Sequence, residues 1–423
     1  MPLPLTAPCR GYWGVVTSMR SANRKQRHLG VRALVSVALL AAAGCDGPRR
    51  SAASRATVPA GRAGVPAVTV FTGRCPAGLT IGFLGPLTGI AAASIGEAQS
   101  NAVQLAIDQF NSAHPACSVS YRGIDSQTGP STAVAQAIVD RSLLAVVGPA
   151  QDSEAQEAEM LFNTADVATI TASATDPSLA AHHWSVFHRA VANDNTEGPA
   201  AADFMVNGLK AKKVAIVDDG SARGRQLAGV SRQQLQVRGI TVVSPPPITN
   251  PASDASAVTT IAAANVDAVF FAGGYHQAAA LAHDLKTAGF TAAFVSDDQA
   301  LDPAFIEAAT PSGAEGAYFL SPIAHALTQS ADQPFVAAYR AKRGAAPSLY
   351  AAEAYDAANE LLAAIAAGNF TRSEINTYVS TTSYHGVLRT YSYAANGELR
   401  GTPPILIHRV IEGRITLVGA VSP

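Results

Sequence analysis

The sequence has no excess of either charge. Its 30 Lys and Arg residues balance 31 Asp and Glu residues, which leaves a formal net charge of -1 over 423 residues. Charged residues make up only 14% of the chain, whereas 48% of it is hydrophobic. This balance provides no basic surface for nucleic acid, and the composition excludes a disordered or acidic-tail protein. A chain of this length and hydrophobic content can bury the cores of two ordinary domains.

The N-terminal region lacks an apolar run long enough to cross a bilayer. Residues 33–43 form an apolar run of 11 residues, against about 20 for a spanning helix. The run follows a basic stretch at residues 20–32, so residues 1–44 are predicted to be a secretory signal peptide. Small residues stand directly before Cys45, as at the bacterial lipoprotein processing site, and we expect Cys45 to be lipidated. An ordinary cleaved signal with an incidental cysteine is the alternative.

Cysteine is scarce. Of the four cysteines, only Cys75 and Cys117 follow Cys45, and an oxidising compartment favours a disulfide between them. Each of the two lies just before a predicted strand. Both sulfur atoms are therefore expected at the same edge of one sheet, where neighbouring strands are about 5 Å apart, a spacing that suits a disulfide. Two free buried thiols are the alternative.

Catalytic and cofactor motifs are missing. We find no phosphate-binding loop, no H-E-x-x-H, no G-x-S-x-G and no C-x-x-C. The spacing of His182, His183 and His188 matches no common zinc site. The segment 218–220 (Asp-Asp-Gly) is predicted to be a turn and helix cap and not a magnesium site. We therefore expect no enzyme activity, no cofactor and no metal.

Short apolar segments alternate with helical patterns from Leu79 onward, after a Pro- and Gly-rich segment. Residues 45–75 are predicted to be the lipidated cysteine and a flexible tether. One helix is predicted from the spacing of Val103, Ile107 and Phe110, and another over 131–143. This alternation predicts βαβ units and a parallel sheet covered on both faces. The predicted strands are 79–84, 118–124, 144–147, 167–171, 214–217, 268–271 and 293–296.

The number of strands exceeds that of a single sheet. About ten β-segments over about 345 residues predict an α/β protein of two doubly wound parallel-sheet lobes, joined by three crossover segments. We place the crossings near Asn193, Pro322 and Gly386. The N-terminal lobe then comprises residues 76–192 and 323–385, and the C-terminal lobe comprises residues 193–322 and 386–423.

The loops after the strands carry the candidate ligand-binding residues. In open parallel sheets, ligands bind beyond the C-terminal strand ends, where helix N-termini present free N–H groups to carboxylate or carbonyl oxygens. An acid such as Asp298 on the facing lobe would suit an ammonium group. Helix capping is the plain alternative for each Ser, Thr and Asp. These loops are residues 85–89 leading to Ile95, 148–153, 171–177, 273–276 and 297–299.

Nine segments occur in order from Leu79 to the C-terminal part of the chain: IGFLGPLTG, GIDSQTGPSTAVAQA, VVGPAQDS, TITASATDPSL, VAIVDD, DAVFFAGGY, DPAFIEAA, EGAYF and PSLYAAEAYDAANELL. Together they resemble the leucine/isoleucine/valine-binding proteins, which are type I periplasmic-binding-fold receptors of ABC importers. The resemblance implies a ligand buried in a cleft between two lobes. The lipoprotein start also fits the form that such receptors take in bacteria without a closed periplasm.

The resemblance also implies ligand contacts by position. Ser173 and Thr175 would hold the ligand carboxylate and ammonium through backbone and hydroxyl groups. Asp298 would pair with the ammonium. The full set placed by resemblance is Ser173, Ala174, Thr175, Tyr275 as a wall of the cleft, Asp298, and Tyr350 as an aromatic contact.

Some positions depart from the family pattern. The family commonly has hydroxyl residues at Gln151 and Asp152, and an ionised Asp152 would repel a ligand carboxylate at a cost of several kcal/mol if desolvated. Ser153, the next residue, would supply the hydroxyl group in place of Asp152. Ile95 replaces a frequent aromatic residue, and Gln277 stands near a usual acid. A plain branched-chain amino acid therefore does not follow, since related members bind amides, urea or aromatic acids.

These observations predict an exported, lipid-anchored, monomeric receptor on the outer face of the cytoplasmic membrane. It would deliver an amino acid or a related amide to an ABC permease, and its ligand would shift the lobes from open to closed. A sensor for a membrane signalling receptor is the alternative. An enzyme built on Asp152, Asp298 and His276 is a third reading, which the missing motifs disfavour.

Overall fold

The computed structural model describes residues 75–89, 95–253, 255–323, 333–401 and 403–421. The predictions for the signal peptide, for Cys45 and for all of the tether except Cys75 fall outside these residues. Among the described helices, none has both the length and the hydrophobicity to span a membrane.

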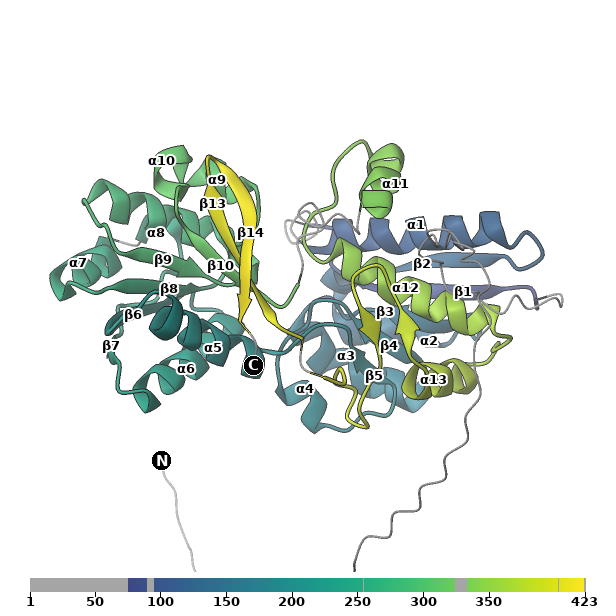
Figure 1. Cartoon of the computed structure of the whole chain (residues 1–423). Helices are drawn as coiled ribbons and strands as arrows, with labels where there is room; N and C mark the ends of the chain where they lie inside the picture. Colours follow the sequence, from purple (N-terminus) through teal and green to yellow (C-terminus); the bar gives the residue numbers. More distant parts are fainter. Residues whose placement is uncertain (1–74, 90–94, 254, 324–332, 402, 422–423) are drawn as a thin grey trace, which may run out of the picture. The chain divides into compact units, whose positions relative to one another are not determined.

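The first sheet has the strand order β2-β1-β3-β4-β5, with all neighbours parallel (Figure 1). Its central strands are apolar on both faces because helices cover both. In β1, Ile81 and Phe83 join one core cluster and Leu84 joins another, as the two-residue strand period requires. The strands are β1 (Leu79–Gly85), β2 (Val119–Asp125), β3 (Leu143–Val147), β4 (Ala168–Thr171) and β5 (Phe187–Arg189).

Helices from distant parts of the sequence cover the first sheet. One core cluster contains residues of α1 (Glu97–Ala113), α11 (Gln333–Arg343), α12 (Ala351–Ala366) and α13 (Arg372–Thr381). The other contains residues of α2 (Pro130–Ile138) and α3 (Asp152–Ala165), and α4 (Ser178–Ala181) follows β4. The helix predicted over 131–143 was wrong at its C-terminal end. There, the Asp140 side chain accepts the N–H of Ser142 and turns the chain into β3.

The second sheet has the order β14-β13-β10-β9-β8-β6-β7. The pairs from β7 to β10 are parallel, whereas β13 runs antiparallel to β10 and β14, an edge that the parallel-sheet prediction missed. The predicted class, α/β with two doubly wound sheets, is confirmed. The strands are β6 (Lys213–Asp218), β7 (Thr241–Val243), β8 (Ala268–Ala272), β9 (Ala293–Ser296), β10 (Tyr318–Ser321), β13 (Ile405–Ile411) and β14 (Arg414–Val421).

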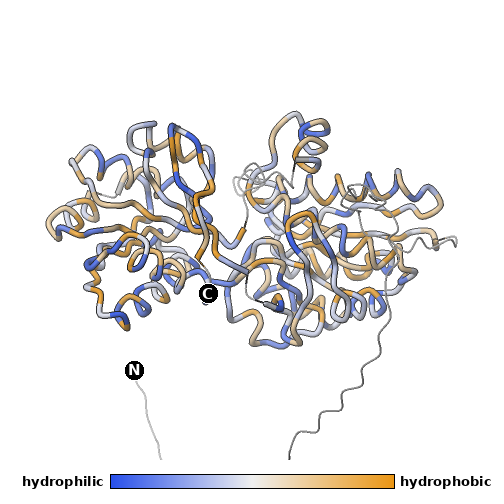
Figure 2. Tube along the Cα trace, in the orientation of Figure 1, coloured by the Kyte–Doolittle hydropathy of each residue, from blue (hydrophilic) through white to orange (hydrophobic). Residues whose placement is uncertain are grey.

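Helices also cover both faces of the second sheet. One face packs on α5 (Asp194–Asp203) and α6 (Ala222–Val237). The other packs on α7 (Ala255–Ala264), α8 (Tyr275–Thr287), α9 (Ala304–Ala308) and α10 (Thr310–Ala314). Hydropathy along the chain follows this layering, with hydrophobic segments on the strands and hydrophilic ones on outer helical surfaces (Figure 2).

The last crossing lies later in the chain than the prediction near Gly386. After the small hairpin of β11 (Tyr384–His385) and β12 (Thr390–Tyr391), Tyr391 and Tyr393 remain in the core of the first lobe. Their hydroxyl groups donate to Asp356 at 3.0 Å and to Glu360 at 2.9 Å, both on α12. These bonds hold the chain on the first lobe until it enters β13. The other domain limits stay predictions.

Cys75 and Cys117 form a disulfide, with their Cα atoms 4.8 Å apart. Strands β1 and β2 pair in parallel from Leu79 opposite Val119, so both cysteines precede the same edge of the sheet. The bridge therefore ties the start of the described chain to the second strand.

We expect Cys75→Ser to lower the free energy of unfolding by about 2 to 4 kcal/mol, because the unfolded chain regains the entropy of a long loop. Chemical denaturation followed by circular dichroism measures this change. The double variant Cys75→Ser/Cys117→Ser is the matched control and should unfold like the single variant. An unfolding midpoint equal to that of the wild type would contradict the prediction.

Candidate functional site

The loop after β4 is held in a defined shape by buried hydrogen bonds. The Thr171 hydroxyl accepts the N–H of Ala174 at 2.9 Å and that of Ser173 at 3.3 Å. The Ser173 hydroxyl donates to the carbonyl of Ala150 at 2.7 Å and accepts from the Gln99 amide at 2.9 Å. The Ser173 side chain is therefore already engaged on both sides.

Arg189, the last residue of β5, holds the same loop from inside the lobe. Its fully buried guanidinium donates to the carbonyls of Ala174 at 2.6 Å and Asp176 at 2.8 Å, and it pairs with Glu398 at 3.3 Å. Arg189 is therefore a positioning residue for the loop that carries Thr175.

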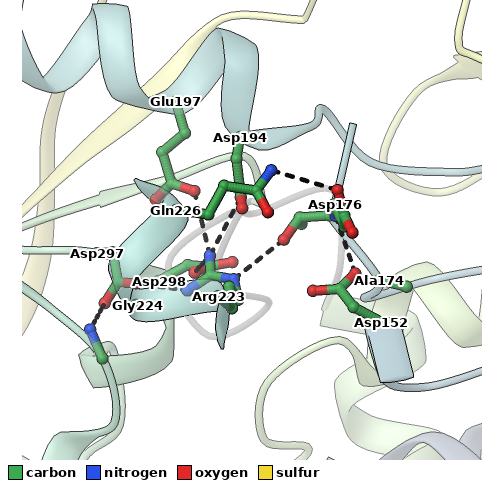
Figure 3. A network of polar contacts seen from close by, with 12 residues as sticks. Asp152, Ala174, Asp176, Asp194, Glu197, Arg223, Gly224, Gln226, Asp297 and Asp298 are labelled. Carbon is green, nitrogen blue, oxygen red and sulfur yellow. Dashed lines mark hydrogen bonds and ion pairs between the residues drawn. The ribbon is translucent and has the colours of Figure 1, made fainter. Parts of the chain in front are cut away.

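Arg223, in the first turn of α6, lies at the centre of a larger polar network (Figure 3). Its side chain is only 9% exposed, and its Nε donates to the Thr175 hydroxyl at 3.0 Å. Four buried carboxylates surround its terminal nitrogens, at N–O distances of 2.5, 2.7, 3.3 and 3.5 Å; these belong to Asp297, Asp298, Glu197 and Asp194, and we call them the acid cluster.

Residues of both lobes meet in this network. Thr175 follows β4 of the first sheet, and Tyr350 stands at the N-terminus of α12, which packs on the same sheet. Asp298 follows β9 of the second sheet and accepts hydrogen bonds from Arg223 and from the Tyr350 hydroxyl. Asp194 begins α5. The network thus connects the C-terminal strand ends of the two sheets.

Burial makes Asp194, Glu197 and Asp297 hard to ionise. It raises the pKa of Asp194 and of Asp297 to about 7, against the opposing positive charge of Arg223. Burial also raises the pKa of Glu197 well above its ordinary value, and the negative charge of Asp298 adds to this. The guanidinium of Arg223 therefore does not compensate the desolvation of these three groups.

The predicted site residues divide into three groups. Thr175, Asp298 and Tyr350 are joined through Arg223, as described above. Asp152 lies at the edge of this network: it begins α3, it accepts the N–H of Asp176 at 2.8 Å, and burial raises its pKa.

The remaining predicted residues lie outside the network's hydrogen bonds. The Ser173 hydroxyl donates to the carbonyl of Ala150, and the carbonyl of Ala174 accepts a hydrogen bond from Arg189. The Ser153 side chain is exposed. Tyr275, at the start of α8, places its ring 4.0 Å from that of His276. Their assignment to a ligand site stays a prediction.

The groups considered for metal binding have other roles. His182 stacks on Trp184 with ring centroids 4.2 Å apart, and buried His188 bonds to the carbonyl of Thr169 at 3.1 Å. The segment 218–220 forms a turn in which Asp218 accepts the N–H of Gly220. Among the residues that the structure describes, no group of three or more His, Cys, Asp or Glu side chains is placed to hold a metal ion.

Sequence reasoning missed Arg223, Asp194 and Glu197. The rule that ligands bind beyond strand ends applies to the strand 214–217 as well, and it would have pointed to the start of the next helix and so to Arg223. Asp194 and Glu197 lie in the segment interpreted only as a crossing. No local pattern indicates that they approach Arg223, because that contact depends on the packing of α5 against α6.

Comparison with known proteins gives one consistent family. The family model described as "Periplasmic binding protein" matches residues 78–410. An "Amino acid binding protein" of Pseudomonas aeruginosa is 34% identical over 228 residues, which cover 52% of this chain and 61% of that protein. The "Leu/Ile/Val-binding protein BraC3" of Rhizobium johnstonii is 31% identical over 295 residues, covering 68% and 79%.

Solved structures share the fold. The substrate-binding protein LivJ of Streptococcus pneumoniae, in complex with isoleucine, has a TM-score of 0.73 at 23% identity and covers 82% of this chain and 99% of its own. A solute-binding protein of R. palustris, in complex with benzoate, has a TM-score of 0.71 at 19% identity and covers 82% and 96%.

The raised pKa values predict how stability depends on pH. A carboxyl whose pKa is raised on folding stabilises the protein below its unfolded pKa, and this contribution is lost as the pH rises through the folded value. For Asp194 that window runs from its ordinary value of 3.8 to about 7. We expect the free energy of unfolding of the wild type to decrease between pH 5 and pH 8. In Asp194→Asn, this decrease should be smaller by about 1 to 2 kcal/mol.

Urea denaturation at a series of pH values measures this difference. Glu307→Gln is the matched control, because Glu307 is an exposed acid of the same lobe. Parallel pH profiles for Asp194→Asn and the wild type would show that Asp194 does not titrate in this window.

Proposed function

The chain belongs to the periplasmic binding protein family, and from this premise we propose that it is the solute-binding receptor of an ABC importer. It captures a small polar ligand of the amino acid class outside the cytoplasm and delivers it to a membrane permease. It catalyses no reaction on that ligand. The names of its relatives, which include amino acid and Leu/Ile/Val-binding proteins, support this class of ligand.

The observation that carries the proposal is the meeting of strand-end residues from two separate sheets. Arg223 of the second lobe donates to Thr175 of the first. Tyr350, which precedes α12 of the first lobe and packs in the core of the second, donates to Asp298 beyond β9. A ligand bound at this place would contact residues of both lobes at once. It would favour the closed arrangement of the lobes only through such two-sided contacts.

The predicted contacts are proposed with one change. Ser173, Ala174 and Thr175 would present backbone and hydroxyl groups to the ligand, and Tyr275 would form a wall. Asp298 was expected to pair with a ligand ammonium. In the structure both its oxygens already accept bonds, from Arg223 and from Tyr350. A ligand cation must therefore share Asp298 with Arg223, or displace it.

We expect one chemical class among amino acids, amides, polyols and aromatic acids to raise the thermal unfolding midpoint. A ligand at about a thousand times its dissociation constant adds about 4 kcal/mol of stability. Differential scanning fluorimetry identifies the class, and calorimetry gives its affinity. If no compound of the panel bound, the receptor function would be untenable.

Asp298→Asn should weaken the binding of the identified ligand at least tenfold, because the negative charge beyond β9 is lost. Glu307→Gln, which removes an exposed acid from the same lobe, should bind like the wild type. Unchanged affinity in a folded Asp298→Asn protein would remove Asp298 from the site.

We further propose that residues 1–44 direct export and that Cys45 carries the lipid anchor. The Cys45→Ser variant should move from the membrane fraction to the soluble extracytoplasmic fraction, whereas Cys9→Ser should fractionate like the wild type. Fractionation of the producing cells, followed by immunoblotting, measures this. Soluble wild-type protein would contradict the anchor.

A further inference from the structure

The acid cluster has more acidic groups than cations to pair with them. Asp194, Glu197, Asp297 and Asp298 all contact the guanidinium of Arg223. Three of the four carboxylates share its single Nη2 nitrogen, and Nε is engaged with Thr175. Four acids thus face one cation whose donors are largely committed.

The surroundings of the cluster add negative charge. Asp152 and Asp176 lie beside it and bond to each other, and Asp176 also accepts from Gln226 on α6. The other buried cation nearby, Arg189, is occupied by two carbonyls and by Glu398. Among the described residues, no second cation pairs with the acid cluster. The charged and titratable groups that face it are Asp152, Asp176, Asp194, Glu197, Arg223, Asp297, Asp298 and Tyr350.

Some oxygens of the cluster have unused bonding capacity. The Oε1 atom of Glu197 accepts no hydrogen bond from any described residue, although the side chain is only 1% exposed. The buried carboxylate of Asp356 is better satisfied, because it accepts two backbone N–H groups and the Tyr391 hydroxyl. A buried carboxylate without sufficient donors takes up either a proton or a cation.

We propose that the acid cluster is the cation-binding part of the ligand site, and that the ligand is a small molecule of net positive charge. A basic amino acid or another compound with a guanidinium or a second ammonium group fits this description. The inference rests on the proposed receptor function and specifies its ligand class. The ligand's cationic group pairs with Glu197 and Asp194, beside Arg223 or in its place.

Charge accounts for the selectivity. The cluster already binds one guanidinium, that of Arg223. The arrangement of its carboxylate oxygens as hydrogen-bond acceptors therefore suits such a group. A zwitterion with a neutral side chain adds no net charge, so the excess of acidic groups over cations remains. An aromatic acid adds another acidic group to this excess. A compound with one more positive than negative group reduces the excess of acidic groups over cations. Protons bound by the carboxylates are released as this compound binds.

Two matched pairs of amino acids test the inference on the wild-type protein. L-Citrulline carries a neutral ureido group in place of the guanidinium of L-arginine, and L-norleucine lacks the terminal ammonium of L-lysine. Calorimetry should give at least tenfold tighter binding for the cationic member of one pair. Titration at pH 7 in two buffers of different ionisation enthalpy should show proton release for that member and none for its neutral partner.

Variants test which residues cause the preference for a cationic ligand. Glu197→Gln should weaken binding of the cationic probe at least fivefold and reduce the number of protons released, whereas Glu307→Gln should change neither. Arg223→Met, which removes the competing guanidinium, should bind the cationic probe more tightly than the wild type. Thermal melts of each variant establish that it is folded before it is titrated.

The outcomes separate this inference from the receptor function. Equal affinity for both members of each pair, or tighter binding of a neutral amino acid or of benzoate, would overturn the cationic ligand and leave the receptor function standing. Failure of every probe and of the wider amino acid panel would overturn both.

Discussion

The guanidinium of Arg223 is the contact on which the two halves of the candidate site depend. It donates to Thr175 of the first lobe and pairs with carboxylates that arrive from α5 and from the loop after β9 of the second. A buried ion pair gains little stability over apolar packing, because both charges must be desolvated, whereas removing one partner costs about 3 to 5 kcal/mol. A cluster with four acids and one base is therefore a poor device for stability. The cluster fits the proposed role in ligand binding better than a role in folding.

The scaffold around this cluster uses buried charges in a different way. Arg189 fixes two carbonyls of the loop after β4, and Arg372 donates to the carbonyls of Leu143, Ile138 and Asp140. Such an arginine replaces the water that these carbonyls would lose on burial, so its positive charge is spread over several acceptors. These residues hold loops in place through hydrogen bonds to neutral carbonyl groups. The acid cluster instead places four carboxyl groups around one guanidinium, which distinguishes it from these structural polar contacts.

The last crossing shows how polar contacts also decide where a lobe ends. Tyr391 and Tyr393 donate to Asp356 and Glu360 on α12, and their rings belong to the first core. The crossing was predicted near Gly386. The hydroxyl bonds that keep the chain on the first lobe for longer join positions more than thirty residues apart, and no local pattern reveals them.

By itself, the sequence determined the α/β class, the position of most central strands, the edge at which Cys75 and Cys117 meet, and the family. Each of these depends on local periodicity, on order along the chain or on strand adjacency, which short segments encode. Only the tertiary structure decided that Arg223 stands among four acids, that Asp298 is already bonded on both oxygens, and that Ser153 faces solvent. Those facts depend on which helix faces are brought together when α5, α6 and the β9 loop pack. Charge interactions between buried groups arise only after that packing has removed the water between them.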